Sequence, residues 1–181
     1  MKSIQKINEE NVRRENFMNK ILLFLYFVSL LVVMLGFYGM NFFTETIAED
    51  GSGGGNGNPA LFLLVFLMPF FFYFLYGTTE LSMRLAESYK KRSTLHISLI
   101  ISVLAVLSIA GYTFLEARAL RREVFLIKDD LASISQLPLW STFSNSIFFN
   151  PLTFILVVLI CYIIGALWSL SRNRRKKILI T

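Results

Sequence analysis

The fold class is decided by an apolar stretch near the start of the chain, which reads ILLFLYFVSLLVVMLGFYGMNFF from Ile21 to Phe43. A helix needs roughly 20 apolar residues to cross a hydrocarbon core of about 30 Å. Three further stretches also lack acidic residues, lysine and arginine, and they cover Ala60–Tyr76, Leu95–Leu115 and Pro151–Ser171. The second of the four, with 17 residues, is near the lower limit for a span. We therefore predict an all-α membrane protein with a bundle of four transmembrane helices.

The composition indicates a single membrane domain. Of the 181 residues, 55% are hydrophobic, and they are gathered in blocks, whereas a soluble domain disperses them. The first stretch is longer than the apolar region of a cleavable signal peptide, so we expect it to remain as an anchor. We divide the chain into a cytoplasmic tail (1–20), a transmembrane domain (21–171) with an outer helical loop (116–150), and a basic tail (172–181).

Lysine and arginine are distributed unequally between the two ends of the spans. Fourteen of them lie in the two tails and in the loop between the second and third spans, and four lie in the loop after the third span. Because cytoplasmic segments are enriched in these residues, we predict that both termini are cytoplasmic. A bacterial plasma membrane is our first choice of compartment, and an organelle inner membrane is the alternative. The net charge of +6 is explained by this topology, so we expect no nucleic-acid partner.

The basic tail suits anionic lipid on the cytoplasmic side, because each basic residue near such a surface contributes about 1 kcal/mol. Fixing the orientation of the fourth span is a simpler role that would suffice by itself. The residues predicted to meet anionic lipid are Arg172, Arg174, Arg175, Lys176 and Lys177.

Four local patterns in the part of the chain before the third span predict further structure. Residues 1–20 contain pairs at i,i+4 helical spacing, but we favour a charged and partly ordered tail over a short helix. The glycine-rich stretch Asp50–Asn58 predicts a flexible external connector. Pro69 should kink the second span. Between the second and third spans, Leu81 and Leu85 fall on one helical face and predict a separate amphipathic helix along the inner membrane surface.

The second and fourth spans both open with Asn-Pro, at Asn58-Pro59 and Asn150-Pro151. An asparagine side chain can accept hydrogen bonds from the free N–H groups of a helix start, and proline fits the first turn because it lacks one of those donors. We therefore expect both helices to begin at these motifs.

A heptad-like pattern follows the third span. Apolar or small residues recur at spacings of three and four from Ala117 to Ile134. We predict that the third span continues outward as one helix to about Ser135 and that its apolar seam contacts a protein partner. The alternative is a helix folded onto the membrane, with Phe125 and Leu126 broadening its apolar face. The residues predicted to contact the partner are Leu120, Val124, Ile127, Leu131 and Ile134.

Small residues recur at helical spacing on the third and fourth spans. In lipid, such stripes allow helix backbones to approach closely, and packing of this kind drives helix association. The residues predicted to pack helices together are Ser98, Ser102 and Ala105 on the third span, and Cys161, Gly165 and Ser169 on the fourth.

Groups suited to catalysis, proton transfer or metal binding are few in and near the spans. The single histidine, His96, lies at the cytoplasmic edge of the third span, where we interpret it as a solvated or lipid-facing side chain. A single cysteine, Cys161, excludes an intrachain disulfide and a cysteine-based metal site. Five outer acids could gather around calcium but lack EF-hand spacing, namely Glu45, Glu49, Asp50, Asp129 and Asp130. We predict no cofactor, no metal and no enzymatic activity.

The predicted function is that of a non-catalytic accessory or assembly subunit of a larger membrane complex. Its partners would be the lipid bilayer, anionic lipids on the cytoplasmic side and other membrane protein subunits. One alternative is a small transporter or permease subunit that works as an oligomer through a path of hydroxyl and amide groups. Another is an immunity-type protein that shields the membrane from a toxin. Purification in mild detergent separates the first two, because a heteromeric complex favours the subunit and a homo-oligomer favours the transporter.

Overall fold

The computed structural model describes residues 2–46, 57–89, 91–127 and 133–178, and within these ranges it describes side chains for residues 19–172. The described residues form helices and connections, without a strand. The long helices are α1 (Lys2–Asn41), α2 (Ala60–Ser88), α3 (Arg92–Ile127) and α5 (Pro151–Ile178). Three short elements lie between α3 and α5, namely η1 (Ile134–Gln136), η2 (Thr142–Ser144) and α4 (Asn145–Phe148). The predicted all-α fold is confirmed.

Four helices in the described part of the chain are long and apolar enough to cross a membrane. The stretches that meet this criterion are Asn19–Asn41, Ala60–Ser88, Arg92–Ile127 and Pro151–Arg172. They coincide with the four spans predicted from the sequence, with longer ends for α2 and α3. The fold is therefore consistent with a multi-pass membrane protein.

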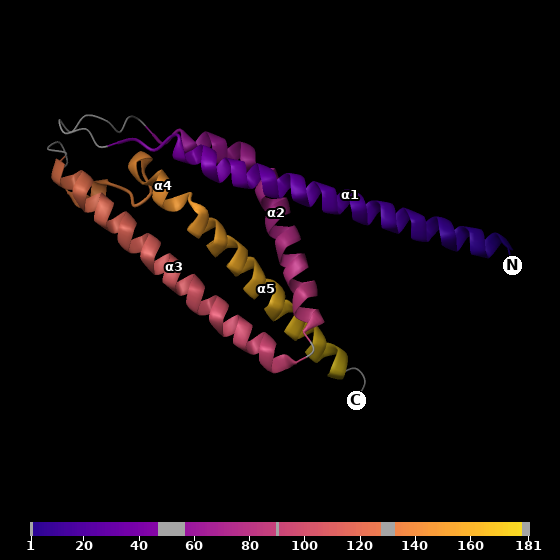
Figure 1. Ribbon diagram of the computed structural model, residues 1–181. Coiled ribbons are helices and arrows are strands. Elements are labelled where there is room, and N and C mark those ends of the chain that lie inside the picture. Colours follow the sequence, from indigo (N-terminus) through magenta and orange to yellow (C-terminus); the bar gives the residue numbers. More distant parts are fainter. Residues whose placement is uncertain (1, 47–56, 90, 128–132, 179–181) are drawn as a thin grey trace.

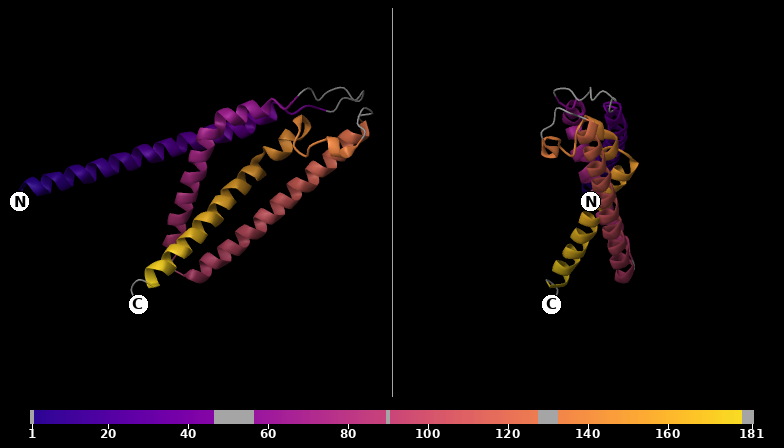
Figure 2. Two further views of the ribbon diagram at one scale, coloured as in Figure 1. Left: turned by 180° about the vertical axis from the view of Figure 1, so that it is seen from behind. Right: turned by 90° about the vertical axis from the view of Figure 1, so that its left-hand side faces the viewer.

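The helices form an open bundle in which α5 lies between α2 and α3 (Figure 1). Helix α1 packs against α2, and its N-terminal part projects away from the other helices (Figure 1 and the left view of Figure 2). We call the end where α1 and α3 finish and α2 and α5 begin the Asn145 end. The opposite end, where α2 finishes, α3 begins and α5 finishes, is called the Arg172 end.

Helix α2 bends sharply partway along its length (Figures 1 and 2). Pro69 is inside this helix. A proline in a helix interior removes one backbone hydrogen bond and its ring collides with the preceding turn, so a bend is the expected response. The bend allows the first part of α2 to follow α1 and the second part to follow α5.

Two predictions about local structure are wrong. Residues 2–20 are part of α1, where a partly ordered tail was favoured. Residues 78–88 are part of α2, where a separate interfacial helix was predicted. Both errors have the same cause: extending an existing helix costs much less free energy than nucleating a new one, and neither segment contains a proline to stop the extension. In α2, Thr78, Ser82 and Ala86 are buried, whereas Leu81 and Leu85 are exposed.

The third correction concerns the outer end of α3. The helix extends beyond the third apolar stretch, as predicted, and is described as far as Ile127, but the backbone at Ser133 is extended (φ −155°, ψ 143°), so the helix does not continue to Ser135. The Arg121 side chain donates to the Ile134 carbonyl oxygen from Nε at 3.1 Å and from Nη2 at 2.6 Å. In one continuous helix, thirteen residues would separate these groups by about 20 Å, so the chain has reversed direction between them.

A local signal in the sequence marks the new element after this reversal. Ser133 and Gln136 form a capping box at η1. The Ser135 N–H donates to Ser133 Oγ at 3.3 Å, and the Ser133 N–H donates to Gln136 Oε1 at 3.4 Å. The pattern Ser-x-x-Gln starts a helix, so it argues against an uninterrupted helix through this position.

Candidate functional site

A network of hydrogen bonds centred on the Asn145 side chain connects the helices at the Asn145 end. The side chain is fully buried, with 0% of its surface exposed. Its Nδ2 donates to the Phe43 carbonyl oxygen at 3.0 Å and to Asn58 Oδ1 at 3.1 Å. Its Oδ1 accepts from Asn58 Nδ2 at 2.7 Å and from Trp140 Nε1 at 3.0 Å. A carboxamide offers two donors and two lone pairs, and here all four are used. One side chain thus joins the end of α1, the start of α2 and the connection before α5.

A second set of bonds runs parallel to this network. The Glu45 N–H donates to the Thr142 carbonyl oxygen at 3.1 Å, and Thr142 Oγ1 donates to Glu45 Oε2 at 3.3 Å. Ser144 Oγ lies 2.9 Å from the Leu139 carbonyl oxygen and receives the Ser141 N–H at 2.8 Å. The two bonds between Glu45 and Thr142 hold the segment after α1 against η2, so Glu45, one of the five outer acids, has a structural contact to a neighbouring segment.

Both Asn-Pro motifs act as helix starts. Asn58 Oδ1 accepts from the N–H of Ala60, the first residue of α2, at 3.0 Å. Asn150 Oδ1 accepts from the Thr153 N–H at 3.1 Å, while the Asn150 N–H donates to Thr153 Oγ1 at 3.0 Å. Asn150 Nδ2 also donates to the Ile147 carbonyl oxygen at 2.8 Å. Asn150 therefore satisfies the end of α4 and the start of α5 with one side chain.

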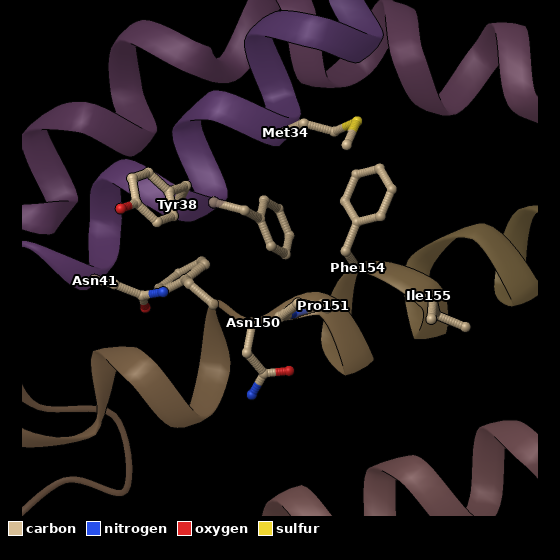
Figure 3. A pocket seen from close by; sticks show the side chains of 9 residues that line it. Met34, Tyr38, Asn41, Asn150, Pro151, Phe154 and Ile155 are labelled. Carbon is tan, nitrogen blue, oxygen red and sulfur yellow. The ribbon is translucent and has the colours of Figure 1, made fainter.

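Beside this network, a groove of about 220 Å³ lies between the end of α1 and the start of α5. Figure 3 shows Met34 from α1 and Phe154 from α5 pointing toward each other across it. Asn41 and Asn150 lie toward one end of the groove (Figure 3), and Asn41 Oδ1 is buried without a hydrogen-bond partner. The remaining lining residues are Phe37, Tyr38, Phe149, Pro151 and Ile155. Such a lining suits the apolar part of a ligand, with an amide at one end.

The stripe Cys161–Gly165–Ser169 lies on the buried face of α5 that meets α2. A Cβ atom added at Gly165 would lie 2.5 Å from the Thr79 carbonyl oxygen and 2.8 Å from the Met83 backbone nitrogen. The two helix backbones are thus in direct contact at this glycine, which is the geometry that small-residue stripes permit in membranes. Ser169 Oγ is buried here without a hydrogen-bond partner.

The small residues of α3 face α5. Ser102 is buried, and the hydroxyl groups of Ser98 and Tyr162 are hydrogen-bonded. Ala105 is half-buried on the same side. Toward the Arg172 end, the buried residues Ala86, Leu95, Leu99 and Ala166 form one apolar cluster across α2, α3 and α5. His96 is on the exposed side of α3, away from this cluster.

The seam on the outer part of α3 is covered by the chain itself. Ala117 and Val124 are only 1% and 2% exposed. Together with Leu120 they line a small cavity whose other wall is the returning segment from Leu137 to Ser144. Ile127 and Ile134 are half-buried, and Leu131 lies outside the described residues. The contacts that we predicted for a partner at Val124 are made within the chain, because the reversal after α3 brings the return segment back along the seam.

At the Arg172 end, a cavity of about 370 Å³ opens between α2 and α5. It is lined by Glu80 and Arg172 together with the aromatic residues Tyr76 and Trp168. Glu80 also pairs with Arg84 one helical turn further along α2, where Arg84 Nε lies 3.0 Å from Glu80 Oε1. For Arg174, Arg175, Lys176 and Lys177, the structure describes the helical backbone of α5 only.

Sequence reasoning missed three features of these sites. Asn145 had a weak signal, as a polar residue within the aromatic return segment. The cavity at the Arg172 end combines Glu80 with Arg172, which are distant in the sequence, and only Arg172 had been assigned a role. Gly111 was given no role from the sequence, although a glycine inside an apolar helix asks for a packing reason.

Within the described residues, no group of three or more His, Cys, Asp or Glu side chains lies close enough to hold a metal ion. The acids Glu49, Asp50, Asp129 and Asp130 are outside these residues, as is most of the glycine-rich connector. No protein-family model, curated protein or solved structure matches the chain. Its function therefore has to be inferred from its own residues.

Proposed function

We propose that the protein is a non-catalytic accessory or assembly subunit of a larger membrane complex, and that the Gly111 face of α3 contacts a transmembrane helix of a partner. We define the Gly111 face as Ile100, Leu104, Leu107, Gly111 and Leu115. Both termini and the α2–α3 connection would lie in the cytoplasm, as the basic residues favour.

The main support for this contact is the space around the glycines of the described spans. At four of them an added Cβ would come within 3.3 Å of an atom from another helix of this chain. The nearest atoms belong to Leu67 at Gly36, Leu63 at Gly39, Tyr26 at Gly77 and Thr79 at Gly165. At Gly111, nothing lies within 4 Å. Glycine in a helix costs about 1 kcal/mol relative to alanine, and close packing offsets that cost at the other four positions. A partner helix would supply the missing contact at Gly111.

The position of Gly111 on α3 supports this reading. Nine residues separate it from Ser102, which is two and a half helical turns, so it lies on the opposite side of α3 from the contact with α5. Leu104, Leu107 and Leu115 share its side and are 59%, 64% and 65% exposed. This face leaves room for a helix backbone to approach Gly111 between leucine side chains, as small residues allow in membranes.

The experiment compares two substitutions to leucine on neighbouring faces of α3. Gly111→Leu should remove a stoichiometric partner from the complex purified in mild detergent, because the side chain fills the site of close approach. Ala110→Leu is the control, since Ala110 is also exposed but lies about 100° around the helix. Recovery of the same complex with both variants would refute the contact. A complex made only of copies of this chain would instead favour the oligomeric transporter.

A further inference from the structure

The cavity at the Arg172 end contains groups of opposite charge from two helices. Glu80 comes from α2 and Arg172 from α5, and both line the same space of about 370 Å³. The close backbone contact at Gly165, also in the lining, holds the two helices together there. The position of Glu80 is further fixed by Arg84, whose Nε donates to Oε1 at 3.0 Å. A carboxylate has about four lone-pair sites, so it can accept from a further donor while keeping this bond.

The aromatic residues of the cavity indicate its depth in a membrane. Trp168 and Tyr76 are 63% and 69% exposed, and tryptophan and tyrosine are enriched where lipid headgroups meet hydrocarbon. Arg172 ends the apolar stretch of α5, so a cation and two aromatic rings lie at the same end of the helix pair. Met83 adds an apolar surface for the part of a lipid below its headgroup.

We propose that this cavity binds the headgroup of a phospholipid that carries a primary ammonium group, such as a phosphoethanolamine lipid. The phosphate lies at Arg172, and the ammonium donates to the Glu80 carboxylate. A purely anionic headgroup would meet the carboxylate as a like charge. A choline headgroup has a cation without N–H donors, so it cannot hydrogen-bond Glu80. This site is independent of the proposed partner contact on α3.

The fluorescence of Trp168 provides a direct readout of binding. The purified full chain in mixed micelles is titrated with phosphatidylethanolamine, phosphatidylcholine or phosphatidylglycerol that carries brominated acyl chains, which quench nearby tryptophan. A Trp168→Phe variant gives the signal of Trp140, which is subtracted. We expect half-maximal quenching at an ethanolamine-lipid concentration about tenfold lower than for the other two, as for one hydrogen bond between charged groups. The three lipids are compared on the unaltered chain, and the Trp168→Phe variant supplies only the Trp140 background.

Three variants test the assigned roles. Glu80→Gln should abolish the preference for ethanolamine over choline lipid, and Arg172→Gln should weaken quenching by all three lipids. Arg92→Gln is the control, because Arg92 is an exposed basic residue that begins α3 at the same end but does not line the cavity. Equal or stronger binding of phosphatidylglycerol in the unaltered chain would overturn the proposal in favour of a simple anionic-lipid site. An ethanolamine preference that survives Glu80→Gln would overturn it as well.

Discussion

Alanine substitutions at glycines of different spans should change stability in opposite directions. At Gly165, the added Cβ would lie 2.5 Å from the Thr79 carbonyl oxygen and 2.8 Å from the Met83 nitrogen, which are backbone atoms and cannot turn aside. Overpacking of this kind costs about 1–3 kcal/mol, whereas the gain in helix propensity from glycine to alanine is about 1 kcal/mol. Gly165→Ala should therefore lower the free energy of unfolding by about 1 kcal/mol. At Gly111 the Cβ meets nothing, so Gly111→Ala should raise it by up to about 1 kcal/mol.

Gly36→Ala provides an intermediate case. Its Cβ would lie 2.2 Å from Leu67 Cδ1, the end of a flexible side chain that can change rotamer. The three variants are compared by equilibrium unfolding of the isolated chain in one detergent, where the expected order of stability is Gly111→Ala, Gly36→Ala and then Gly165→Ala. In a chain of this size, 1 kcal/mol corresponds to a change in Tm of about 2–4 °C. Equal stabilisation by Gly165→Ala and Gly111→Ala would refute the direct backbone contact between α2 and α5.

Three further predictions concern the Asn145 end, the seam and the topology. Asn145→Ala should lower the free energy of unfolding by about 2–4 kcal/mol, because it leaves the buried partners of that side chain unsatisfied. Amide hydrogen exchange should become faster around Asn58, and unchanged exchange would contradict the network. Val124→Asp should destabilise the isolated chain by several kcal/mol, while the exposed Arg122→Asp should change it by less than about 0.5 kcal/mol, as unfolding in detergent can measure. Reporters fused within Gly51–Gly57 and at Thr181 should report opposite sides of the membrane, and the same side would contradict four spans.

The four spans could be predicted because hydropathy is a local property. Each apolar stretch identifies its own helix without any knowledge of the others, and lipid requires a helix to satisfy the backbone. The Asn-Pro starts and the Pro69 bend were predictable for the same reason. They depend on chemistry within one turn of the residue concerned.

The sites depend on contacts between distant segments, and here the sequence was less informative. Asn145 and Asn58 are 87 residues apart and form a reciprocal amide pair that no spacing rule indicates. The heptad pattern after the third span correctly marked an apolar face, since Ala117 and Val124 are buried. It could not indicate whether that face meets a partner or the returning chain. Likewise, Gly111 and Gly165 have similar surroundings in the sequence, yet only Gly165 meets another backbone.

The distribution of contacts indicates which surfaces remain for a partner. In lipid, burial of apolar side chains gives little drive for helix association, so hydrogen bonds and close packing must supply it. Among the described residues, α2 and α5 have a close backbone contact at Gly165, and α1, α2 and the return segment share the Asn145 network. Within the described residues, nothing lies within 4 Å of a Cβ added at Gly111, on the face of α3 opposite α5. If the Gly111 face contacts a partner, as we propose, substitution by leucine should lower the stability of the isolated chain at Gly165 and remove the partner at Gly111, and the two effects can be measured separately on the isolated chain and on the purified complex.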